Sequence, residues 1–108
     1  MPSQAELLEL GISHHRAGRL EQAEQAYAQL RRENPDHPDA LHLLGVIAHQ
    51  RGDARRAITL INQAILVRPG VAAMYANLAE ACRAAGDARG AVEHCRRALQ
   101  LVRHRLGA

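Results

Sequence analysis

The 108-residue sequence has no phenylalanine, no tryptophan and no lysine, and it has only two tyrosines. Proteins hold single-stranded nucleic acid largely by stacking bases on aromatic side chains, so this scarcity argues against such a ligand. The core has to be built from leucine, isoleucine, valine and alanine, side chains that suit closely packed helices. We therefore expect a helical protein with no nucleic-acid partner.

Cysteine is as scarce as the aromatic residues. Only Cys82 and Cys95 are present, and the Cys-x-x-Cys spacing of redox and zinc sites does not occur. We expect both to be buried free thiols that act as small hydrophobic groups and face each other across one helix pair.

Long hydrophobic runs are also absent. No segment approaches the ~20 consecutive apolar residues that a membrane-spanning helix requires. Residues 1–10 have neither the basic start nor the apolar run of a signal peptide. These absences predict a soluble, cytoplasmic protein that has no membrane partner.

The charge is moderate and unevenly distributed. Fourteen arginines against 11 acidic residues give a formal net charge of +3. Residues 1–37 hold four arginines and six acids, whereas residues 72–108 hold six arginines and three acids. Acidic residues lie near the arginine pairs 55–56 and 96–97 in the sequence, so we interpret these pairs as solvated surface and not as a nucleic-acid site.

Seven histidines raise the question of a metal site. His15, His42 and His49 could converge on one surface, but zinc needs three or four ligands in a tetrahedral array. Neither His-x-x-x-His nor His-Glu-x-x-His spacing occurs, so we predict polar surface histidines, no metal and no cofactor. No phosphate loop or nucleophile elbow is present either, which predicts that the chain is not an enzyme.

What the sequence does contain is a repeated helical pattern. Between Pro38 and Val71, apolar or small residues recur at the spacing of one helix face in two segments separated by a turn at 51–53. They are Leu41, Leu44, Gly45 and Ala48, followed by Ala57, Ile58, Ile61, Ala64 and Ile65. Pro69 ends the unit, since proline cannot continue a helix.

This unit recurs once before and once after, at a distance of 34 residues. Gly45 corresponds to Gly11 and Ala79, and Ala57 corresponds to Ala23 and Ala91. A helix–turn–helix unit of this period resembles the tetratricopeptide repeat, or TPR. The sequence departs from the family pattern because its first motif position is leucine or tyrosine and never tryptophan, and because Arg103 replaces the third proline.

The resemblance implies an all-α, right-handed TPR superhelix in a single domain spanning 1–108, with repeats at 4–37, 38–71 and 72–105. We expect six helices near residues 4–17, 20–33, 38–50, 54–68, 72–85 and 88–105, with 107–108 fraying. Ser3 and Glu6 should form a capping box, and His37 or Asp36 should cap the third helix.

Family members generally bind a peptide or partner segment in a concave groove lined by the first helix of each repeat. The matching positions here are Leu8, Ile12, His15, Arg16, Asp39, His42, Val46, His49, Gln50, Ala73, Asn77, Glu80 and Arg83. The resemblance thus predicts a protein–protein interaction scaffold. Chaperone-binding members hold a carboxylate with Lys/Asn pairs, and of those positions only Asn77 fits, which argues against that ligand class.

Two alternatives use the same fold. The segment 37–45 resembles the TPR segments that precede glycosyltransferase or sulfotransferase domains in bacterial proteins, so the chain could be the N-terminal module of such an enzyme. Alternatively it could be a homo-oligomerising scaffold. An apolar stripe on the last helix, whose inner part we expect to pack within its own repeat, would supply Leu99, Val102 and Leu106 as the interface.

Overall fold

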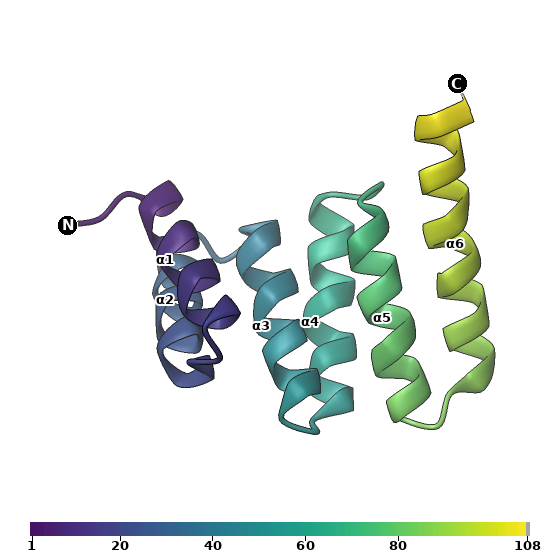
Figure 1. The fold of residues 1–108 in the computed structure, drawn as a ribbon, viewed down its shortest axis with the longest axis horizontal. Helices are drawn as coiled ribbons and strands as arrows, with labels where there is room; N and C mark the ends of the chain where they lie inside the picture. The colour runs from purple at the N-terminus through teal and green to yellow at the C-terminus, as the bar shows by residue number, and fades with distance from the viewer. Residues whose placement is uncertain (108) are drawn as a thin grey trace.

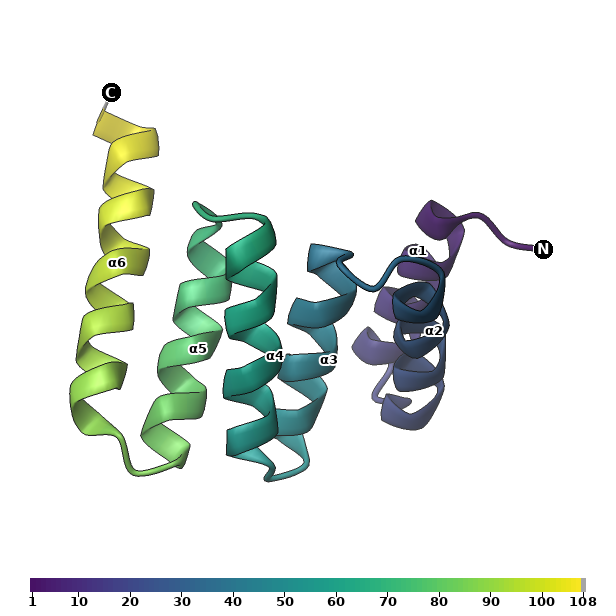
Figure 2. The ribbon, with the colours of Figure 1, turned by 180° about the vertical axis from the view of Figure 1, so that it is seen from behind.

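The computed structural model describes residues 1–107, which form six α-helices and no strand. The helices are α1 (Gln4–Arg16), α2 (Leu20–Glu33), α3 (Pro38–Gln50), α4 (Ala54–Val67), α5 (Ala72–Ala84) and α6 (Ala88–Gly107). Consecutive helices run antiparallel and follow one another in a row from the N-terminus to the C-terminus (Figure 1). The view from behind shows the same order (Figure 2). The predicted all-α architecture is confirmed.

Side chains placed just before the helices explain where three of them begin. The Ser3 hydroxyl accepts a hydrogen bond from the backbone N–H of Glu6 at 3.1 Å, and the Glu6 carboxylate accepts one from the Ser3 N–H at 3.1 Å. This confirms the predicted capping box. Of the two candidates for α3, His37 is the cap, because its Nδ1 accepts from the Ala40 N–H at 3.3 Å. Asp53 caps α4 in the same way.

The helix ends differ slightly from the prediction. Helices α1, α4 and α5 each end one residue earlier than expected, because the expected last residue is the C-cap in the structure, as at Ala17 with φ −83° and ψ 0°. The following glycine, Gly18, has φ +79°, a conformation that suits glycine best. Helix α6 continues to Gly107, so the expectation that Gly107 frays is wrong. Ala108 lies outside the described residues.

Close helix crossings depend on glycine at two positions. A Cβ atom at Gly45 would lie 2.6 Å from Cγ1 of Ile61, and one at Gly11 would collide with the ring of Tyr27. Both Ile61 and Tyr27 are fully buried. The small residues of the repeat pattern therefore set how closely α1 approaches α2 and α3 approaches α4.

The main core runs between the helix pairs and is mostly aliphatic. Its buried residues are Ala23, Tyr27, Leu41, Leu44, Ile47, Leu60, Ile61, Ala64, Met74, Leu78 and Cys82. They come from α2, α3, α4 and α5, so each helix pair is stabilised by packing on the next. This is the behaviour expected of stacked repeats.

Helix α6 has no buried residue, and its packing differs from the prediction. Ala91 packs against the core and the His94 ring lies 6.4 Å from the Tyr75 ring, whereas Val92, Leu99, Val102 and Leu106 are exposed. The inner part of the apolar stripe therefore does not pack within its own repeat. Within residues 1–107, no helix is both long enough and apolar enough to cross a membrane.

The two cysteines are free, as predicted, but they do not share one environment. Cys82 is buried, whereas Cys95 is exposed. The prediction that both are buried is wrong, because α6 is the last helix of the row and no later helix of the described residues covers its outer side. Burial raises the pKa of the Cys82 thiol, and the nearby Asp87 charge adds to the effect.

Candidate functional site

Two side-chain hydrogen bonds join the first helices of successive pairs. His15 on α1 contacts Gln50 on α3, and His42 on α3 contacts Asn77 on α5. Each bond spans 35 positions along the chain, but the two use different positions of the repeat, because His15 corresponds to His49 and not to His42. We call the predicted groove residues on α1, α3 and α5 the odd-helix face.

The histidine at the N-terminal end of this face is held from two sides. His15 Nε2–H donates to the Gln50 side-chain oxygen at 2.7 Å, and the Tyr27 hydroxyl donates to His15 Nδ1 at 3.4 Å. The two rings also meet edge to face, with centroids 6.1 Å apart. Burial raises the pKa of Tyr27 to about 12, against a smaller opposing effect of Arg16, so the hydroxyl keeps its proton.

His42 is not the surface histidine that the sequence suggested. Its side chain is only 8% exposed, and its Nε2 accepts a hydrogen bond from the Asn77 amide at 2.8 Å. Burial lowers the pKa of His42, and the charge of Asp39 only partly opposes this effect. His42 is therefore a neutral structural bridge between α3 and α5.

The third histidine, His49, differs from the other two in its hydrogen bonding. His49 Nδ1 is buried and has no hydrogen-bond partner among the described residues. Within residues 1–107, no three side chains of the His, Cys, Asp and Glu type come together in a way that could hold a metal ion. The convergence of His15, His42 and His49 into one cluster is thus not observed.

The remaining residues of the odd-helix face divide into apolar and charged groups. Leu8, Ile12 and Val46 are half-buried, and the two residues on α1 pack against the core. Two acidic residues are already paired: Asp39 with Arg68 at 3.2 Å, and Glu80 with Arg83 at 2.8 Å. The exposed members are Arg16, Gln50, Ala73, Glu80 and Arg83.

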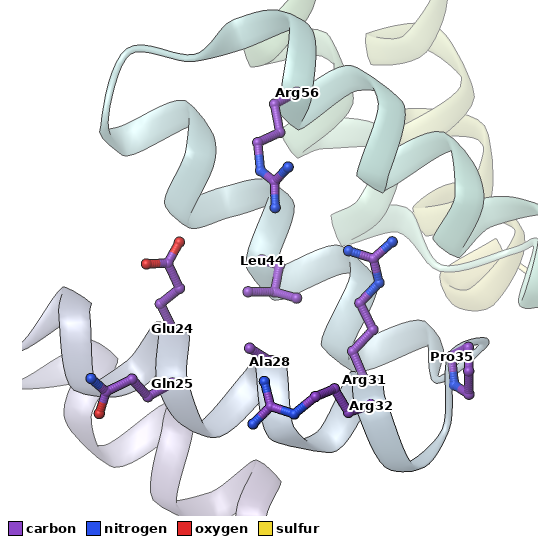
Figure 3. A pocket seen from close by; sticks show the side chains of 8 residues that line it. All are labelled: Glu24, Gln25, Ala28, Arg31, Arg32, Pro35, Leu44 and Arg56. Atoms are coloured by element: carbon purple, nitrogen blue, oxygen red, sulfur yellow. The ribbon is translucent and has the colours of Figure 1, made fainter.

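A pocket of about 580 Å³, which the repeat pattern does not predict, lies between α2 and α4. Figure 3 shows its lining residues. They are Glu24, Gln25, Ala28, Arg31, Arg32, Pro35, Leu44 and Arg56. Arg56, which we expect from the sequence to lie on a solvated surface, is exposed and also lines this pocket. The sequence signal for this pocket is the presence of arginines on the second helices of adjacent repeats. Repeat spacing alone does not show that the surface between those helices is concave.

Comparison with known proteins places the chain among repeat proteins. Models of the tetratricopeptide repeat match residues 14–82 and 73–108. Human tetratricopeptide repeat protein 36 is 37% identical over 94 residues, covering 87% of this chain and 47% of that protein. The mouse protein of the same name is 42% identical over 66 residues, covering 61% of this chain and 36% of its own. The chain thus spans less than half the length of these relatives.

Solved structures are similar over almost the whole chain. A Thermobaculum terrenum O-GlcNAc transferase mutant matches with a TM-score of 0.89 and 28% identity, covering 94% of this chain and 20% of that one. The second TPR of RPAP3, solved with an HSP90 peptide, matches with a TM-score of 0.85 and 16% identity, covering 91% of both chains. With a family model matching well over half of its residues, the chain belongs to the tetratricopeptide repeat family.

Proposed function

We propose that the chain is a non-catalytic scaffold that binds a peptide or partner segment on the odd-helix face. The observation that carries this proposal is the two hydrogen bonds between successive odd-numbered helices, His15–Gln50 and His42–Asn77, which hold α1, α3 and α5 relative to one another. A surface whose side chains are already positioned loses less conformational entropy when a partner binds.

The chemistry of this face suits an extended segment. Half-buried Leu8, Ile12 and Val46 offer apolar contact, and exposed Gln50 and Arg83 offer polar contact at its edges. Apolar contacts at the centre with hydrogen bonds at the rim are the usual arrangement of a protein interface. The RPAP3 repeat domain, solved with a bound peptide, supports the proposal by analogy of fold alone.

The test begins with peptides selected from a random displayed library against the whole chain. Val46→Arg should weaken their binding by about tenfold or more, since it places a charge among the apolar contacts. Val67→Arg is the matched control, because Val67 is a 45% exposed valine on α4 and lies outside the odd-helix face. Equal loss in both variants, or loss in the control alone, would contradict the proposal.

A second candidate function is homo-oligomerisation through α6. The observation that favours it is the exposure of Leu99, Val102 and Leu106, which are 57%, 41% and 84% exposed. Such an apolar stripe is stabilised when another surface covers it.

Light scattering over a concentration series tests this second function. A molar mass that rises with concentration, and that Leu99→Ser/Val102→Ser returns to the monomer value, would support it. Leu66→Ser serves as the control, because Leu66 is 84% exposed but lies on α4. A monomer at every concentration would exclude it.

A third candidate is that the chain is the N-terminal module of a larger glycosyltransferase-like enzyme. The similarity to one fifth of the O-GlcNAc transferase chain favours this reading. Sequencing the gene beyond the codon for Ala108 is the direct test. A downstream glycosyltransferase-like domain supports the module, and a stop codon excludes it.

A further inference from the structure

The pocket between α2 and α4 is a second surface, separate from the odd-helix face. None of its eight lining residues belongs to that face. Its floor includes Leu44 of α3, which is only 5% exposed, and Ala28 of α2. At about 580 Å³ it falls within the range of roughly 300–1,000 Å³ that is usual for ligand pockets.

Three arginines give this pocket its charge. Arg31 and Arg32 extend from α2 and Arg56 from α4, and Figure 3 shows the three side chains arranged around Leu44 and Ala28. Within residues 1–107, none of the three forms an ion pair. The one acidic lining residue, Glu24, is paired with Arg51 at 2.6 Å. The pocket therefore keeps an unbalanced positive charge.

The placement of the arginines points to a ligand with more than one anionic group. Arg31 and Arg32 are neighbours on one helix, so their side chains leave it about 100° apart. Arg56 comes from a different helix. A single small anion would be suited to guanidinium groups that converge on one point, whereas these are distributed around an apolar floor.

We propose that this pocket binds an acidic peptide segment in which an apolar side chain lies between carboxylates. The apolar side chain covers Leu44, and the carboxylates pair with Arg31 and Arg56. Each guanidinium can donate two parallel hydrogen bonds to one carboxylate, which lysine cannot do. The apolar floor adds a favourable contribution from buried apolar surface, which an ion pair at an exposed surface does not have.

The test is a fluorescence anisotropy titration of the whole chain with a labelled Glu-Glu-Leu-Glu-Glu peptide in low salt. We expect Arg31→Gln/Arg56→Gln to raise the dissociation constant by about tenfold or more, since two bidentate pairs are lost. The matched control is Arg89→Gln/Arg96→Gln, which removes the same charge from exposed positions on α6. It should change the constant by less than about twofold.

A neutral peptide, a lysine variant and competing small anions distinguish specific peptide binding from general attraction of negative charge. A Gln-Gln-Leu-Gln-Gln peptide should not bind, and Arg31→Lys/Arg56→Lys should bind weakly although its net charge is unchanged. Val46→Arg, which tests the odd-helix face, should leave this binding intact. Equal loss in the α6 control, binding of the neutral peptide, or competition by succinate or inorganic phosphate at the peptide's own concentration would overturn the proposal.

Discussion

Gly45 lies where α3 crosses α4, and its missing side chain sets how closely the two helices approach. The nearest atoms to a Cβ at this position would be Cγ1 of Ile61 at 2.6 Å and the backbone oxygen of Ala57 at 3.2 Å. The backbone oxygen cannot move aside without displacing α4. Side-chain volume added here must therefore separate the helices.

Gly45→Leu should lower the free energy of unfolding by about 1–3 kcal/mol or more, as overpacked cores do. Urea denaturation followed by circular dichroism measures this change. Gly107→Ala is the control, since a Cβ at Gly107 meets nothing within 4 Å. An unchanged midpoint for Gly45→Leu would contradict the close crossing.

His42 should make stability depend on pH. Because burial lowers its pKa in the folded chain, the unfolded chain takes up a proton first as the pH falls below about 6.5. This contribution to the free energy of unfolding is present above that pH and is lost as the pH falls through the lower folded-state pKa. Asp39 on the same helix reduces the effect without reversing it.

Urea denaturation at a series of pH values compares the wild type with His42→Gln. The wild type should lose more stability than the variant between neutral and mildly acidic pH, because only the wild type carries the buried imidazole. Parallel profiles for the two proteins would show that His42 does not disfavour protonation in the folded chain.

For single residues, the packing role of small side chains was easier to predict than the burial of polar side chains. The role of Gly45 follows from its place in the repeat, because every helix pair must cross somewhere. The burial of His42 could not be read in the same way, since it depends on Asn77, which lies 35 positions later on another helix. The exposure of Cys95 likewise depends on what lies beyond α6.

At the scale of single helices, local capping chemistry determines the boundaries. Ser3 and Asp53 each accept a hydrogen bond from a backbone N–H in the first turn, which would otherwise have no partner within the helix. These signals lie within a few residues of the boundary that they set. All six helices were predicted from the sequence with ends that differ by at most two residues, although α2 and α5 have no side-chain cap and follow from the repeat pattern alone.

Ser3→Ala should lower the free energy of unfolding by about 1 kcal/mol, the usual loss when an N-cap hydroxyl is removed. Thermal unfolding followed by circular dichroism measures the shift. Ser13→Ala is the matched control, because Ser13 is an exposed serine within α1. It should stay within about 0.5 kcal/mol of the wild type. Equal effects in the two variants would contradict the role of the capping box.

At the scale of the whole molecule, stacked helix pairs leave several surfaces free for partners. The odd-helix face and the arginine-lined pocket use different sides of the helices, and the stripe on α6 lies at the end of the row. The repeat pattern predicted the first and the third of these as surfaces. The repeat pattern could not predict the pocket, because its lining combines residues of α2 and α4 with Leu44 of α3. The roles of these surfaces and the repeat boundaries stay predictions.

Binding of a partner segment on the odd-helix face is tested by mapping where a selected peptide contacts the chain. Amide chemical shifts of the isotope-labelled protein are followed during titration with a peptide from the displayed library. We expect the largest changes in chemical shift at Val46, His49 and Asn77. Changes confined to α2, α4 and α6, with none on α1, α3 or α5, would contradict it.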